Sequence, residues 1–84
     1  MKLTQCEVIL KAMLENPMKE DWKASDFQFG EYFVGYEASA RMSDLLREYP
    51  FLFKVTRDGR FRTMSINWKN NKRVIKQIKK DLGI

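Results

Sequence analysis

The chain is predicted to form a single α+β domain over residues 1–84, with three core helices, a β-hairpin and a further C-terminal helix. Three observations predict this class. A capping-box pattern opens a stretch of helical apolar spacing, a second helical stripe ends at Pro50, and an Asp58-Gly59 turn separates two alternating segments. A chain of 84 residues is long enough for one domain of modest stability.

The first helix is predicted at residues 4–15. In Thr4-Gln5-Cys6-Glu7, the Thr4 side chain caps the Glu7 amide and the Glu7 carboxylate reaches back to the Thr4 amide. Apolar residues then recur at helical spacing, and Asn16-Pro17 ends the helix. The apolar stripe consists of Cys6, Ile9, Leu10, Met13 and Leu14.

A loop carrying Trp22 into the core is expected next, followed by a short helix at 25–29 with Ser25 or Asp26 as its cap and Gly30 as its terminator. Residues 30–36 are expected to form an aromatic turn. Burial of its side chains is the expectation, whereas exposure of Tyr32 and Phe33 would indicate a protein-binding patch.

The third helix is predicted at 36–48, and it ends before Pro50. Its apolar stripe consists of Ala38, Met42, Leu45 and Tyr49.

The hairpin is predicted at 51–67, with Asp58-Gly59 as a two-residue type I′ turn. This register places Arg57 opposite Arg60, with Arg62 on the same face. The inner face would carry Phe51, Phe53, Val55, Met64 and Ile66. Like charges opposed across two strands are destabilising, so the arginine cluster favours an anionic partner over simple solvation.

The last helix is predicted at 70–82, with Val74, Ile75, Ile78 and Leu82 as a narrow apolar stripe among lysines and arginines. The stripe is expected to dock on the first helix and complete the core. The alternative is that it pairs with a second copy of the chain to form a homodimer.

The charge distribution predicts a polyanionic partner. The net charge is +5, but residues 1–40 carry four Lys/Arg against seven Asp/Glu, a net −3, while residues 41–84 carry twelve against four, a net +8. The absence of histidine and of a phosphate-binding glycine loop argues against an enzyme, and neither a cofactor, a metal nor a small-molecule ligand is expected. A nuclease built from scattered carboxylates is the least favoured alternative.

The single cysteine, Cys6, excludes an intramolecular disulfide and fits a reducing compartment. It is interpreted as a small core residue rather than a reactive thiol. Because the sequence contains neither a membrane-length apolar run nor a signal-peptide pattern, we expect a cytoplasmic protein without a membrane partner.

Two short motifs extend this interpretation. The pattern Ala38-x-x-Arg41-Met42-Ser43-x-Leu45, followed by Asp58-Gly59-Arg60-Phe61, is similar to that of small bacterial and phage proteins of the winged helix-turn-helix family. The resemblance covers about residues 4–67. The aromatic segment before the third helix and the added C-terminal basic helix depart from the family's pattern.

The resemblance implies that the chain binds double-stranded DNA, as a small transcriptional regulator or a DNA-binding accessory protein. The third helix would enter the major groove, and the hairpin would be the wing. The DNA-contacting residues would be Ser39, Ala40, Arg41, Ser43 and Arg47 on the helix and Arg57, Arg60 and Arg62 on the wing, with additional phosphate contacts from Lys54, Lys69 and Lys72.

Some of these assignments have alternatives. Arg41 is within helical reach of Glu37 and Asp44, so an ion pair is at least as well supported as DNA contact. The alternative function is a winged-helix adaptor or oligomerisation module that binds protein. A third helix left open beside a positive hairpin favours DNA, whereas a third helix covered by the last helix or by a second copy favours the adaptor.

Overall fold

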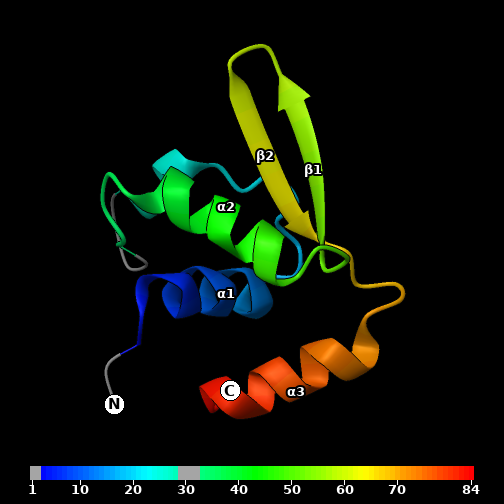
Figure 1. Cartoon of the computed structure of the whole chain (residues 1–84). Coiled ribbons are helices and arrows are strands. Elements are labelled where there is room, and N and C mark those ends of the chain that lie inside the picture. The colour runs from blue at the N-terminus through cyan, green and yellow to red at the C-terminus, as the bar shows by residue number, and fades with distance from the viewer. Residues whose placement is uncertain (1–2, 29–32) are drawn as a thin grey trace.

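The computed structural model describes residues 3–28 and 33–84, with Asp58 described by its backbone alone. Within these residues the fold is α+β, with three α-helices, one 3₁₀ turn and a two-stranded antiparallel hairpin (Figure 1). The elements are α1 (Gln5–Glu15), η1 (Ala24–Phe27), α2 (Ala38–Glu48), β1 (Phe53–Asp58), β2 (Phe61–Ile66) and α3 (Lys72–Leu82). No helix in the described part of the chain is both long enough and apolar enough to span a membrane.

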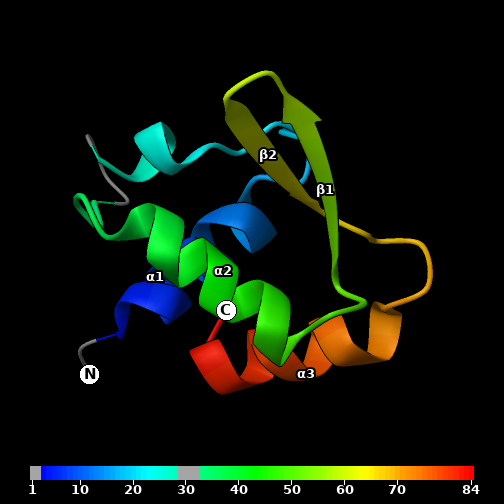
Figure 2. The ribbon, with the colours of Figure 1, turned by 45° about the horizontal axis from the view of Figure 1, so that its top comes forward.

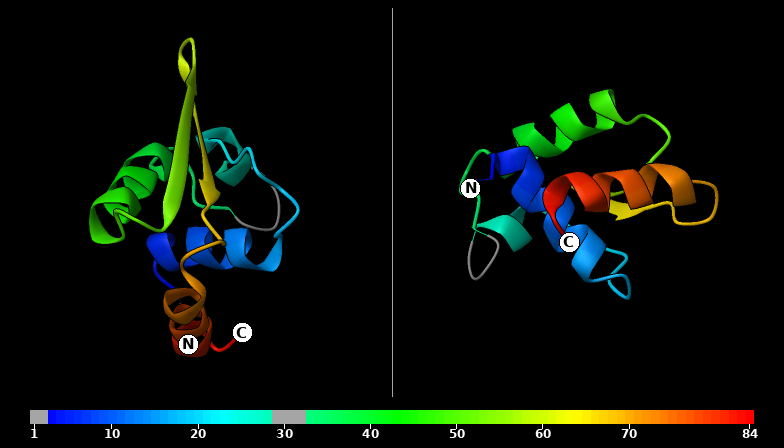
Figure 3. Two further views of the ribbon diagram at one scale, coloured as in Figure 1. Left: turned by 90° about the vertical axis from the view of Figure 1, so that its right-hand side faces the viewer. Right: turned by 90° about the horizontal axis from the view of Figure 1, so that it is seen from below.

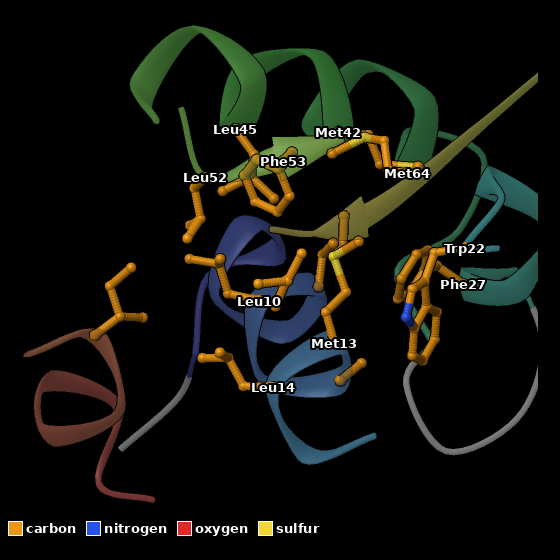
Figure 4. Packing of buried hydrophobic residues seen from close by; sticks show 14 of the residues in the cluster. Leu10, Met13, Leu14, Trp22, Phe27, Met42, Leu45, Leu52, Phe53 and Met64 are labelled. Atoms are coloured by element: carbon orange, nitrogen blue, oxygen red, sulfur yellow. The ribbon is translucent and has the colours of Figure 1, made fainter. Parts of the chain in front are cut away.

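The start of α1 is set by the predicted capping box. The Glu7 amide donates to Thr4 Oγ1 at 3.2 Å, and the Thr4 amide donates to Glu7 Oε1 at 3.0 Å. The hydrogen bond from the Thr4 amide lowers the pKa of the Glu7 carboxyl because the charged form accepts it. The helix then supplies much of the core, where Leu10, Met13 and Leu14 are buried against the other elements (Figure 4).

Trp22 enters the core as predicted, and the backbone explains how. Its amide donates to the Met64 carbonyl at 3.0 Å and its carbonyl accepts from the Met64 amide at 2.8 Å, which forms an antiparallel bridge beside β2. The indole stacks on the ring of Phe27, with 5.3 Å between the ring centroids. The segment before η1 is therefore attached to the hairpin's base.

The predicted helix at 25–29 is wrong in its extent. Only one 3₁₀ turn forms, at Ala24–Phe27, because the Asp26 carboxylate accepts from the Lys23 amide at 2.8 Å and starts the turn one residue earlier. Asp26 is therefore a residue of the turn whose side chain caps the start of that turn, and Ser25 is not the N-cap residue. The expected terminator, Gly30, lies outside the described residues.

The α2 helix covers most of the predicted range of 36–48, but it begins at Ala38. Its predicted core stripe is confirmed, since Ala38, Met42 and Leu45 are fully buried and Tyr49, which follows the helix, is half-buried.

The predicted hairpin register is wrong by two residues. Arg57 pairs with Arg62, and Asp58 pairs with Phe61, so the turn consists of Gly59 and Arg60. Gly59 has a φ of +60°, and no described residue other than glycine has a positive φ, which is the sign pattern of a type II′ turn. A shift of two residues preserves the faces, so Arg57 and Arg62 still share the side of the hairpin that carries the core residues.

Phe51 does not join the inner face of the hairpin. The chain turns at residues 50–52, which leaves Phe51 83% exposed and buries Leu52 in its place. The Leu52 carbonyl accepts from the Asn67 amide at 2.7 Å and holds the two ends of the hairpin together. Val55, also predicted to be inward, is 42% exposed, whereas Met64, its partner on β2, is fully buried. β1 is the outer strand (Figure 1), and β2 is flanked on its other edge by the Trp22 segment.

The α3 helix packs on α1, as its apolar stripe predicts. Ile75 and Ile78 are buried and Leu82 packs against the core, whereas Val74 lies at the edge of the stripe and is exposed. The helix begins at Lys72 rather than 70, after Asn71 donates from Nδ2 to the carbonyls of Phe51 and Asn67. α3 and the hairpin tip lie at opposite ends of the molecule, with α1 and α2 between them (Figures 1 and 3).

The Gly59 conformation gives a test of the observed turn. A Cβ added at Gly59 meets no atom within 4 Å, so the cost of Gly59→Ala is the positive φ alone, and we expect the free energy of unfolding to fall by about 1 kcal/mol. Arg60→Ala is the matched control, with an expected change of less than about 0.5 kcal/mol. Urea denaturation followed by tryptophan fluorescence measures both, and equal losses would contradict the assigned turn.

Candidate functional site

A positive groove of about 430 Å³ lies between η1, α2 and the hairpin. Figure 3 shows the hairpin rising with α2 on one side and η1 on the other. Four cationic side chains line it, together with Ser39 and Phe61, and its described lining includes no carboxylate. The cations are Lys23, Arg57, Arg60 and Arg62. We call this surface the hairpin groove.

Arg62 connects the hairpin to α2. Its Nη1 donates to Ser43 Oγ at 3.0 Å, and its Nη2 donates to the Ser39 carbonyl at 3.1 Å. Ser43 Oγ also donates to the Ser39 carbonyl at 3.2 Å. Because its guanidinium is held on α2, Arg62 can stand opposite Arg57 on the hairpin while part of its charge is satisfied by helix oxygens.

The other two arginines of α2 share one carboxylate. Arg41 Nε lies 3.0 Å from Asp44 Oδ2, although the angle does not satisfy a hydrogen bond, and Arg47 Nη2 contacts Asp44 Oδ1. The ion pair expected as the alternative for Arg41 therefore forms with Asp44. Arg47 keeps an exposed side chain, with 80% of its surface accessible. The charge of α2 is therefore partly balanced, whereas the hairpin arginines form no ion pair with a described carboxylate.

The outward face of α2 carries small side chains. Ser39 and Ala40 are exposed, and Ser43 is half-buried under the Arg62 guanidinium. α3 does not cover this face, because it packs on the far side of α1 (Figures 1 and 2). A partner can therefore approach Ser39 and Ala40 closely and reach the hairpin groove from the same side.

The three lysines predicted as additional contacts lie elsewhere. Lys54, Lys69 and Lys72 line a second groove, of about 600 Å³, together with Lys19. Lys54 projects from the hairpin face opposite to Arg57, because side chains alternate along a strand. The sequence therefore identified two basic surfaces as one.

Lys23 and Phe61 in the hairpin groove were not assigned as site residues from the sequence. Lys23 belongs to the loop before η1, and its Nζ lies 5.7 Å from the centroid of the Phe61 ring, which is 66% exposed. The backbone bridge at Trp22 places Lys23 beside the hairpin. No local sequence pattern predicts this contact, because it depends on the backbone pairing between residues 22 and 64.

A second exposed feature is aromatic. Phe33 is 65% exposed and Tyr36 is 96% exposed, both just before α2. The expected burial of Phe33 is therefore wrong, while Tyr32 lies outside the described residues. Exposed aromatic side chains can contact either a base or a protein.

The Cys6 thiol is partly buried against α2. Burial raises the pKa of the Cys6 thiol, and Cys6 Sγ lies 3.8 Å from the Arg41 carbonyl, which suits an inert, partly buried side chain. No group of three or more metal-ligating side chains occurs within the part of the chain that the structure describes.

Comparisons of the chain with protein-family models, with curated proteins and with solved structures each found no match.

The contact between Arg62 and Ser43 is testable by a double-mutant cycle. We expect Arg62→Gln and Ser43→Ala to be non-additive, with a coupling free energy of about 0.5–1 kcal/mol, because either change removes the same hydrogen bond. Urea denaturation of the wild type, both single variants and the double variant measures it. In the control cycle, Ser65→Ala takes the place of Ser43→Ala. Because Ser65 lies on the other face of β2, the free-energy changes caused by Ser65→Ala and Arg62→Gln should be additive.

Proposed function

We propose that the chain binds double-stranded DNA, with the hairpin groove holding the phosphate backbone and the outward face of α2 lying in the major groove. The observation that carries this proposal is the convergence of Lys23, Arg57, Arg60 and Arg62 beside the exposed Ser39. Phosphate contacts by arginine and lysine supply most of the affinity of such proteins.

The arrangement of elements supports a winged-helix fold for this proposal. The order runs α1, the Trp22 bridge strand, η1, α2 and the β1–β2 hairpin, which would serve as the wing. α3 is an addition to that arrangement. In a protein of this kind α2 reads the major groove and the wing contacts the adjacent backbone.

The geometry of α2 suits this role. Its 11 residues correspond to a helix about 16 Å long, and a helix fits a major groove about 12 Å wide. Ser39 and Ala40 allow close approach to base edges, and the exposed Arg47 reaches either a guanine or a phosphate. Ser43 and Arg62 also fix the angle between the helix and the wing. The biological role proposed is that of a small cytoplasmic transcriptional regulator or DNA-binding accessory protein.

A protein-binding adaptor remains the second candidate, and the exposure of Phe33 and Tyr36 favours it. An adaptor would use these aromatics as anchors, and its affinity would depend weakly on salt. DNA binding is preferred because α2 is not covered by α3 and because the groove next to it gathers cations.

Salt dependence tests the proposal. If the four groove cations each neutralise one phosphate, the plot of log affinity against log salt should have a slope of about −3.6, so that a fourfold rise in salt weakens binding roughly 150-fold. Fluorescence anisotropy with a random-sequence duplex measures this. In the Arg57→Gln/Arg60→Gln variant the slope should become shallower by about 1.8, with similar losses on all sequences.

The matched control is Arg57→Lys/Arg60→Lys, which keeps both charges and should retain most of the affinity. An affinity for duplex that is unchanged by the glutamine variant, or that does not vary with salt, contradicts DNA binding through the hairpin groove. Absence of salt-dependent duplex binding, together with loss of protein partners on Phe33→Ser, would instead support the adaptor.

A further inference from the structure

A second positive surface lies on α3, apart from the hairpin groove. Between Lys72 and Leu82 the helix carries five lysines and arginines and one carboxylate, Asp81. Lys72, Lys76 and Lys80 form a row at i, i+4 spacing on the solvent side. Lys72 also lines a groove beside the hairpin with Lys19, Lys54, Lys69 and one carboxylate, Glu20.

The cations of α3 form no ion pair with a described carboxylate. No carboxylate of the described residues lies within 4.0 Å of their amino or guanidinium nitrogens, and Asp81 instead accepts from Gln77 Nε2 at 2.9 Å. On α2, by contrast, Asp44 pairs with both Arg41 and Arg47. Like charges at i, i+4 spacing destabilise a helix, so a bound polyanion would relieve repulsion within the Lys72–Lys76–Lys80 row.

The position of α3 separates this surface from the hairpin groove. The hairpin tip and α3 lie at opposite ends of the molecule, which extends 33 Å along its longest axis (Figures 1 and 3). The Debye length is about 8 Å at physiological salt, so charge at one end has little effect on an anion at the other. DNA is stiff over about 150 base pairs, so a short duplex held by the hairpin groove does not bend around to α3.

Building on the proposed function, we propose that the basic face of α3 is a second nucleic-acid backbone site, and that one copy of the chain bridges two duplexes. The contacts would be to phosphates, because flexible lysines without a recognition helix beside them carry no base readout. An anionic membrane fits less well. Ile75, Ile78 and Leu82 are already packed against the core, which leaves no apolar face to enter a bilayer.

A two-duplex capture assay tests bridging. One duplex of about 20 base pairs is fixed on beads, and a second, fluorescent duplex is offered with the full chain. The test variant is Lys72→Gln/Lys76→Gln/Lys80→Gln, since glutamine retains helix propensity and removes charge. We expect it to bind a single duplex within about twofold of wild type and to capture the fluorescent duplex at least about tenfold less well.

The charge-preserving control is Lys72→Arg/Lys76→Arg/Lys80→Arg, which should bridge like the wild type. Equal capture by the glutamine and wild-type proteins overturns the inference. Sedimentation at the assay concentration shows whether the chain forms a dimer. If capture of the second duplex depends on dimer formation and not on the charge of α3, the bridging inference is also overturned. Binding to phosphatidylserine vesicles that depends on the α3 lysines, with α3-independent capture of duplex, would reassign the surface to membranes.

Failure of the proposed function gives a different result. If the Arg57→Gln/Arg60→Gln variant binds a single duplex as tightly as wild type, the hairpin groove is not the primary site. If that variant loses single-duplex binding while the α3 glutamine variant bridges normally, DNA binding stands and only the bridging inference is overturned.

Discussion

The backbone pairing between Trp22 and Met64 is the interaction on which the rest of the structure depends. Met64 is fully buried, pairs with Val55 on one edge and with Trp22 on the other, and so makes β2 the middle of three extended segments. This attachment fixes the hairpin base against α1 and η1. Arg62, two residues before Met64 on the same face, is thereby directed at α2, while Lys23 follows Trp22 to the hairpin's edge.

Features determined by neighbouring residues were predictable from the sequence. The α1 capping box needs only Thr4 and Glu7, and the stripes of α1 and α2 follow from helical periodicity. The hairpin register was not predictable, because both Asp58-Gly59 and Gly59-Arg60 make acceptable two-residue turns. The choice between them depends on the seating of Phe53, Met64 and Ile66 in the core, which involves residues distant in sequence.

The sequence predicted which types of residue form the candidate site. It predicted less well which of those residues lie together on one surface. All three hairpin arginines line one groove despite the altered register. A shift of two residues keeps Arg57 and Arg62 on their face, and Arg60 lines the same groove from the turn. Charge counting placed Arg41 and Arg47 with them, but Asp44 lies within reach of both and balances part of their charge. Lys54, Lys69 and Lys72 separate from this site because strand alternation and the position of α3 place them on another side.

The two positive surfaces are separate because α1 is buried on both sides. α2 packs on one side of it and α3 on the other, so the outward faces of these two helices point away from each other (Figure 1). Had α3 packed on α2, it would have covered Ser39 and Ala40 and left a single basic surface. The apolar stripe of α3 is narrow and consists of Ile75, Ile78 and Leu82, which are sufficient for docking on α1. Lysine and arginine occupy much of the remaining helix surface. The same packing that completes a small core therefore also determines how many polyanions the chain can contact at once.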